Sequence, residues 1–126
     1  MPRKESVLRR KSEEFADRIA KLYKFVLAQQ EMVMSKQIYR SGTSIGANIA
    51  ESINAQSEAD FINKLSIALK EANETEYWLS RLYHAGYIDQ RGLTSMKSDN
   101  DELIKMLVCS IKTVRKRTKE KNEEER

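Results

Sequence analysis

Ser41-Gly-Thr-Ser-Ile-Gly-Ala-Asn-Ile-Ala-Glu51 consists almost entirely of small residues, yet it keeps the apolar rhythm of an α-helix. At about 100° per residue, one helical face holds Ile38, Gly42, Ile45, Ile49, Ser52 and Ile53. Gly42 and Gly46 each weaken a helix interior by up to about 1 kcal/mol relative to alanine. Because small residues let another helix approach closely, we expect a tight helix–helix contact to offset that loss. No catalytic site follows from this stretch alone.

Ser44, Asn48 and Glu51 fall together on a flank of the same helix. Buried polar side chains in proteins are normally hydrogen-bonded. We therefore expect these three residues to form a structural network with polar groups on the following helix or on a neighbouring subunit.

The composition favours an all-α protein with a single domain spanning residues 1–126. The 126 residues include one proline and four glycines, 33% are charged, and no segment alternates like a β-strand. The apolar spacing predicts helices over about 8–30, 35–53, 57–85 and 89–119, followed by a frayed, charged tail over 120–126. Short connections between such helices predict an antiparallel up-down-up-down four-helix bundle.

Capping signals punctuate the four predicted helices. The expected N-cap residues are Ser12, Ser35, Ser57 and Asp89. Gly86 suits the left-handed position that follows a helix C-terminus. Within the third helix, Glu76 falls on the apolar stripe, so either its carboxylate is buried and hydrogen-bonded or the stripe is less buried there.

A second apolar face on the third helix indicates a subunit interface. Ile67 and Trp78 lie roughly opposite the main stripe, and Glu71 and Glu74 lie beside them. A monomeric bundle would expose both apolar side chains, and an exposed tryptophan in register with an isoleucine is typical of an interaction surface.

The two ends of the chain are basic and the middle is acidic, although the net charge is only +4. If the first and last helices pack side by side, their cations would form a positive surface suited to phosphate contacts. The candidate nucleic-acid-binding residues are Arg9, Arg10, Lys11, Arg18, Lys21, Lys112, Arg115, Lys116, Arg117 and Lys119. Few aromatic residues accompany them, so single-strand readout by stacking is not expected. The alternative is that these cations simply form a solvated face.

The sequence lacks the residues that metal sites, disulfides and the common catalytic motifs require. Cys109 and His84 are the only cysteine and histidine, so neither a disulfide within the chain nor a zinc site is expected. No phosphate-binding loop, catalytic triad or Glu-x-x-His di-iron motif occurs. We therefore expect no enzyme activity, cofactor or metal. With neither an apolar leader nor a transmembrane run, we expect a cytoplasmic protein without a membrane partner.

Three segments together, 37–51, 60–79 and 86–88, resemble the bacterial 23S rRNA intervening-sequence protein family. That family is related to the accessory variability determinant of diversity-generating retroelements, a basic homopentamer that binds a reverse transcriptase and nucleic acid. The resemblance implies a homopentamer of four-helix bundles with a non-enzymatic role near RNA. Family members often carry an apolar residue where Glu76 stands.

The family's motif residues in this chain are Arg40, Ser41, Ser44, Asn48, Glu51, Glu71, Glu74, Tyr77 and Trp78. The resemblance implies that they are architectural, as part of the oligomer interface or of its polar network. A pentamer would carry a net charge of about +20, which favours binding to a polyanion.

We therefore expect an oligomeric, non-enzymatic scaffold that binds RNA or a nucleoprotein through the basic surfaces of its first and last helices. The alternative is a protein-interaction module acting as an accessory subunit of a retroelement reverse transcriptase. A gene inside a ribosomal RNA insertion would favour the first function, and a neighbouring reverse-transcriptase gene would favour the second.

Overall fold

The computed structural model describes residues 4–126, and every regular element in that range is an α-helix. The helices are α1 (Lys4–Leu27), α2 (Met34–Ser52), α3 (Glu58–His84) and α4 (Gln90–Glu124). No strand occurs among these described residues, so the predicted all-α class with four helices is confirmed. Residues 1–3 of the N-terminal stretch considered for a leader lie outside the described residues.

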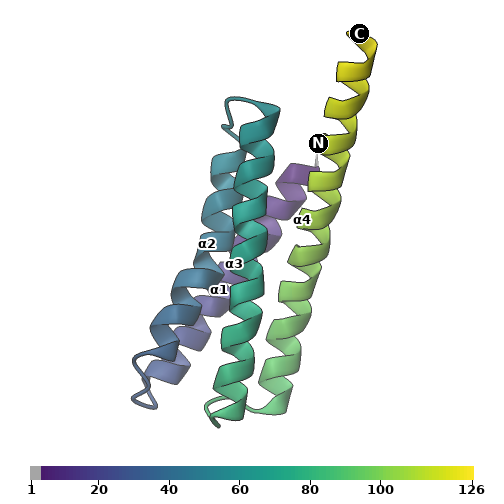
Figure 1. Cartoon of the computed structure of the whole chain (residues 1–126). Coiled ribbons are helices and arrows are strands. Elements are labelled where there is room, and N and C mark those ends of the chain that lie inside the picture. Colours follow the sequence, from purple (N-terminus) through teal and green to yellow (C-terminus); the bar gives the residue numbers. More distant parts are fainter. Residues whose placement is uncertain (1–3) are drawn as a thin grey trace.

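The four helices lie side by side, and their three connections alternate between the two ends (Figure 1). Over the described residues, α1 packs against α2 and α4, and α3 packs against the same two helices. The C-terminal part of α4 projects beyond the ends of the other helices (Figure 1). No described helix combines the length and the apolar character needed to cross a membrane.

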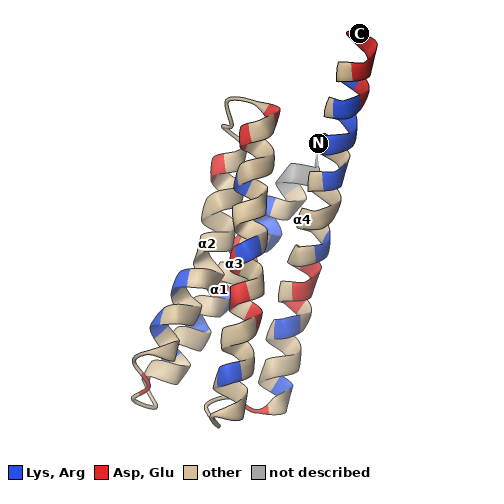
Figure 2. Ribbon diagram, viewed as in Figure 1, with Lys and Arg blue, Asp and Glu red and all other residues tan. Residues whose placement is uncertain are grey.

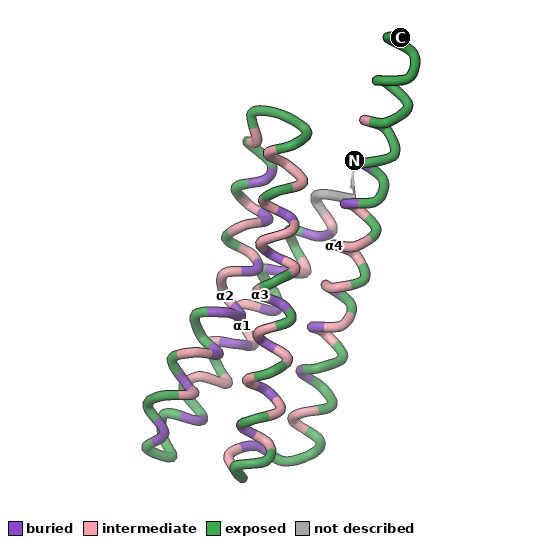
Figure 3. Tube along the Cα trace, viewed as in Figure 1, coloured by how far each residue is buried: buried purple, intermediate pink, exposed green. Residues whose placement is uncertain are grey.

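The core runs along the inside of this arrangement, where all four helices contribute buried turns (Figure 3). Fully or almost fully buried apolar side chains include Leu8, Phe15, Ile19, Ile38, Ile45, Ile49, Leu65, Leu79, Leu103 and Leu107. A buried side chain of this size contributes about 1.5–3 kcal/mol to folding. The projecting end of α4 is exposed almost throughout (Figure 3).

The predicted tight contact is confirmed at Gly42. A Cβ atom on this residue would lie 2.6 Å from Cγ1 of Ile19, so α2 approaches α1 more closely there than a side chain permits. Gly46 lies against Ser12, although less tightly, because its Cβ would lie 3.4 Å from Ser12 Oγ.

Two of the four predicted N-caps are wrong. Ser12 is buried inside α1, and its hydroxyl donates to the Arg9 carbonyl at 2.7 Å. Ser35 lies in the first turn of α2, and no hydrogen-bond partner for its hydroxyl is found among the described residues. Instead the carboxylate of Glu31 accepts hydrogen bonds from the first backbone amides of α2.

The other predicted helix boundaries agree better. Ser57 accepts from the Asp60 amide at 3.0 Å, Asp89 accepts from the Gly92 amide at 2.7 Å, and Gly86 has φ of 86°. The expected frayed tail is wrong, however, because α4 continues to Glu124.

Glu76 fits the second of its two alternatives. Its side chain is 39% exposed and its carboxylate lies 3.2 Å from Lys97 Nζ, in an ion pair between α3 and α4. The apolar stripe of α3 is therefore interrupted at this position. Thr75, one residue earlier, takes the buried position, with its hydroxyl oxygen 3.0 Å from that of Ser41 on α2.

Candidate nucleic-acid interface and oligomer surface

The predicted cations of α1 are largely neutralised by nearby carboxylates. Arg9 Nε lies 3.1 Å from Glu13 Oε1, and Arg10 Nη1 lies 2.8 Å from Glu14 Oε1. Both pairs have i,i+4 spacing and exposed side chains, so each contributes about 0.3–0.5 kcal/mol to helix stability. They also lower the net positive charge that α1 presents to a polyanion.

Two further cations of α1 join it to α4. Lys11 Nζ lies 2.7 Å from Glu102 Oε1, and Arg18 Nη1 lies 2.6 Å from Asp99 Oδ2. The Arg18 guanidinium also donates to the Ser95 hydroxyl at 2.8 Å. These contacts show that α1 and α4 lie side by side, as the predicted basic surface requires. However, the positive charges of Lys11 and Arg18 are compensated by carboxylates of α4.

The cations near the C-terminus of α4 are in a different environment. Among the side chains that the structure describes, residues 7–126, none of them forms an ion pair with a carboxylate. We call this exposed set the α4 basic segment, and it consists of Lys112, Arg115, Lys116, Arg117 and Lys119. Its blue bands cover much of the upper part of α4, where the helix leaves the bundle (Figure 2). Lys21 on α1 is likewise exposed and forms no ion pair with the described side chains, but the densest run of such cations lies near the C-terminus of α4.

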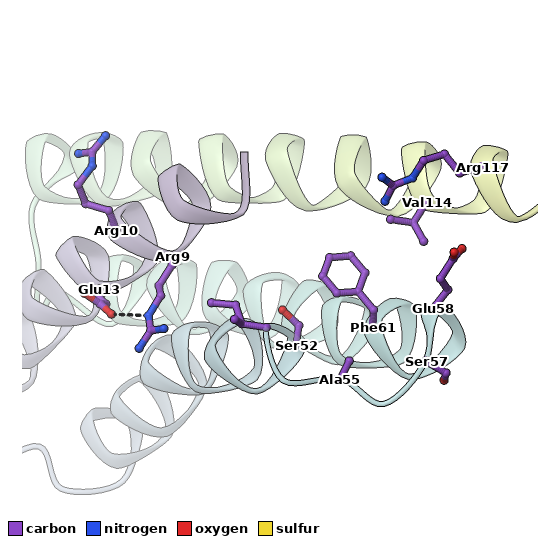
Figure 4. Close-up of a pocket in the computed structure, with 11 residues that line it drawn as sticks. Arg9, Arg10, Glu13, Ser52, Ala55, Ser57, Glu58, Phe61, Val114 and Arg117 are labelled. Carbon is purple, nitrogen blue, oxygen red and sulfur yellow. Dashed lines mark hydrogen bonds and ion pairs between the residues drawn. The ribbon is translucent and has the colours of Figure 1, made fainter. Parts of the chain in front are cut away.

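An open groove of about 760 Å³ lies where the N-terminal part of α1, the α2–α3 connection and α4 meet. It brings together three of the predicted cations, Arg9, Arg10 and Arg117. Phe61 projects from α3 toward Val114 on α4, and Arg117 lies beside Val114 (Figure 4). We call this feature the Phe61 groove. Phe61 continues the apolar face of α3 that also holds Leu65 and Leu79, and this spacing gives no sign of the groove.

The α2–α3 surface carries a connected polar cluster made from the predicted interface residues. Arg40 Nη1 lies 3.1 Å from Glu71 Oε2, and the same guanidinium forms an ion pair with Glu74. The Trp78 indole also donates to Glu74, at 3.1 Å. The hydrogen bond from Trp78, together with the hydrogen bond and charge of Arg40, lowers the pKa of Glu74.

An aromatic group lies next to this cluster. Tyr77 is 56% exposed, its ring meets that of Trp78 edge to face at 5.0 Å, and the Arg81 guanidinium lies 5.7 Å from its centre. Ile67 is half-buried on the same helix. Trp78 is also half-buried and packs against the core, so the expectation that a single bundle would expose both Ile67 and Trp78 is wrong. The exposed part of this face consists of Tyr77 and Arg81, residue types that are enriched in protein interfaces.

The flank of α2 behaves differently from the prediction. Ser44 donates to the Arg40 carbonyl at 2.6 Å, and Asn48 donates to the Ser44 carbonyl at 2.9 Å, so both side chains bond to their own helix. Only Glu51 reaches the next helix, where its carboxylate lies 3.1 Å from Lys64 Nζ. The short side chains of Ser44 and Asn48 find a backbone acceptor one turn earlier before they reach α3.

Among the described residues, no group of three or more histidine, cysteine, aspartate or glutamate side chains is arranged to hold a metal ion. His84 ends α3, and its ring meets that of Tyr83 edge to face at 5.1 Å.

Comparison with known proteins identifies the family of the chain and a related solved structure. The family described as 23S rRNA-intervening sequence protein matches residues 4–109. A solved crystal structure is that of a protein with unknown function from the S23 ribosomal protein family of Bacteroides thetaiotaomicron. Its sequence is 58% identical to this chain, and the two structures superpose with a TM-score of 0.86. The alignment covers 87% of this chain and 99% of that one. No curated protein matches the chain. The family match ends before the α4 basic segment begins.

Proposed function

The chain belongs to the 23S rRNA-intervening sequence protein family, and we propose that it is a non-enzymatic, oligomeric scaffold that binds RNA or a nucleoprotein. The α4 basic segment, assisted by the cations of α1, provides the contacts. The observation that carries this proposal is the contrast between the paired arginines of α1 and the five exposed cations near the C-terminus of α4, none of which forms an ion pair with the side chains described over residues 7–126.

Phosphate contacts of this kind give affinity without strong sequence preference and weaken as salt is added. A helix that leaves the bundle is accessible from several sides, which suits the backbone of a folded RNA. The matching experiment is a filter-binding titration of the full chain against structured RNA at low and moderate salt. Binding that falls steeply with salt supports the proposal, and absence of binding at low salt refutes it.

The proposed scaffold is an antiparallel up-down-up-down bundle that assembles through the exposed face of α3 into a homopentamer. The support is the aromatic pair Tyr77 and Trp78 beside the Arg40–Glu74 ion pair. Five copies would carry a net charge of about +20, which raises the local attraction for RNA. Light scattering of the purified chain tests the assembly separately from RNA binding.

The same aromatic face supports a second candidate, an accessory protein-interaction module for a reverse transcriptase. In that case Tyr77 and Trp78 would face the partner. Co-purification with a reverse transcriptase encoded beside the gene would favour this function, whereas RNA binding by the isolated chain favours the first. Both candidates place the protein in the cytoplasm.

A further inference from the structure

The Phe61 groove combines an apolar lining with arginine, a pairing that the bundle itself does not require. Ile53 is 45% exposed there, and Phe61 is only half-buried although it packs against the core. Val114, which is buried, faces Phe61 across the groove (Figure 4). Apolar surface left open to water between helices is typical of a binding groove.

The charges at the groove are arranged unequally. Arg9 is paired with Glu13, which also lines the groove, and Arg10 is paired with Glu14. The other lining carboxylate, Glu58, accepts a hydrogen bond from the Thr118 hydroxyl. Arg117 forms no ion pair with the side chains described over residues 7–126, so its guanidinium is the one available to an anionic ligand.

An aromatic ring beside an available guanidinium fits an unpaired nucleotide. Proteins that bind single-stranded RNA stack bases on aromatic rings and hold phosphates with arginine. The volume of about 760 Å³ lies within the range of small-molecule pockets and is large enough for one base. A base inside a paired stem is stacked between its neighbours and does not offer its face to an aromatic side chain. The cations of the α4 basic segment continue from Arg117 along the same helix and would contact the phosphates on either side.

We propose that the Phe61 groove binds an unpaired nucleotide of RNA, with its base against the ring of Phe61 and a phosphate at Arg117. This inference rests on the proposed RNA-binding function and names the form of RNA that the interface prefers. It differs from the expectation of purely electrostatic binding because the bundle brings Phe61 next to cations that are distant in the sequence.

The test compares a short single-stranded RNA with a blunt duplex of the same length, using fluorescence anisotropy at one salt concentration. Phe61→Leu keeps an apolar side chain but removes the ring, and Phe61→Tyr keeps the ring. We expect Phe61→Leu to lower affinity for the single strand about tenfold and affinity for the duplex less than twofold. Phe61→Tyr should recover most of the single-strand affinity that Phe61→Leu loses, because it retains an aromatic ring for stacking.

Two further variants separate binding from folding. Arg117→Gln changes an exposed side chain and should also weaken single-strand binding more than duplex binding. Phe25→Leu removes a ring that is 58% exposed at the opposite end of α1. This variant should change neither the single-strand affinity nor the duplex affinity. Thermal unfolding followed by circular dichroism checks that each variant is folded.

The outcomes distinguish the two proposals. If the wild type binds neither RNA, the proposed function and this inference both fail. If it binds RNA but Phe61→Leu affects single strand and duplex equally, or affects neither, the inference is overturned while the scaffold function stands. A groove that takes a protein segment would give this last result.

Discussion

Gly42 on α2 lies against Ile19 on α1 so closely that a Cβ atom on the glycine would be 2.6 Å from Ile19 Cγ1 and 2.9 Å from Ile19 Cγ2. Both carbons are attached directly to the Ile19 Cβ atom, and β-branched side chains have little χ1 freedom in a helix. Ile19 is fully buried. The contact therefore fixes the separation of the first two helices, and the small-residue stretch of α2 is a packing element.

Replacing Gly42 with alanine should destabilise the bundle. Overpacking a rigid core site costs about 1–3 kcal/mol, and the better helix propensity of alanine returns up to about 1 kcal/mol. We expect a net loss of about 1–2 kcal/mol in the free energy of unfolding, measured by chemical denaturation.

Gly46→Ala is the matched control for this prediction. Its Cβ would lie 3.4 Å from the nearest atom, Ser12 Oγ, which is close to ordinary contact. This variant should therefore be neutral or more stable by up to about 1 kcal/mol. Equal stability losses in the two variants would contradict the close-packing argument.

Sequence patterns predicted the parts of the structure that depend on neighbouring residues along one helix. The apolar period placed Ile45 and Ile49 in the core, and the caps at Ser57 and Asp89 follow from local chemistry. Contacts between segments that are distant in the sequence could not be predicted from the periodicity of a single helix. Phe61 has the same periodic position whether its ring is enclosed or lines a groove, because that depends on where α4 runs.

The sequence pattern also predicted the wrong N-terminal cap for α2. The predicted cap was Ser35, whereas the side chain that accepts from the first amides belongs to Glu31, three residues before the helix begins. The Glu31 carboxylate accepts from the amides of Val33 at 2.7 Å, Met34 at 2.7 Å and Ser35 at 3.3 Å. Glu31→Ala should leave these amides without an acceptor and lower the free energy of unfolding by about 1–2 kcal/mol.

Glu31→Gln keeps one acceptor oxygen and should lose less stability than Glu31→Ala. Chemical denaturation of both variants, together with hydrogen exchange at the first amides of α2, measures the effect. Unchanged exchange at Met34 in Glu31→Ala would show that the carboxylate does not hold this helix end.

The proposed interface predicts that Trp78→Ala weakens assembly while the chain stays helical. Tyr77→Ala provides a second variant, since its side chain is 56% exposed and its loss leaves the core intact. Light scattering should show a lower average mass at a fixed protein concentration for both variants, with circular dichroism at 222 nm nearly unchanged. A monomeric wild type would remove the interface argument altogether.

The α2–α3 surface cluster predicts a change of stability with acid. Because the hydrogen bond from Trp78 and the ion pair with Arg40 lower the pKa of Glu74 in the folded chain, the ionised form stabilises the fold above the ordinary glutamate value of 4.5. That stabilisation is lost as the pH falls from 4.5 through the lowered pKa. Its size is modest, since exposed ion pairs contribute about 0–1 kcal/mol.

Glu74→Gln should therefore lower the free energy of unfolding at pH 7, and this loss should be smaller at pH 2, because the advantage of the ionised carboxylate declines as the pH falls below 4.5. Denaturation curves at both pH values measure the difference. Glu120→Gln, in the exposed C-terminal part of α4, is a suitable control because the Glu120 side chain makes no ion pair with the described side chains. If the difference in the free energy of unfolding between wild type and Glu74→Gln were the same at pH 2 as at pH 7, it would not come from the charge of the carboxylate.

The unequal pairing of the cations predicts which helix dominates RNA affinity. Replacing Arg115, Lys116 and Lys119 with glutamine removes three exposed charges and should reduce the slope of log affinity against log salt by about 2 to 3 units. Replacing Arg10 of α1 in the same way should change the slope by well under the roughly 0.9 unit that one phosphate contact gives, because its charge is already compensated by Glu14 at 2.8 Å. Salt titrations of both variants against one duplex RNA provide the comparison. Equal changes per charge removed would mean that the ion pairs of α1 open on binding and that both helices contact the phosphates alike.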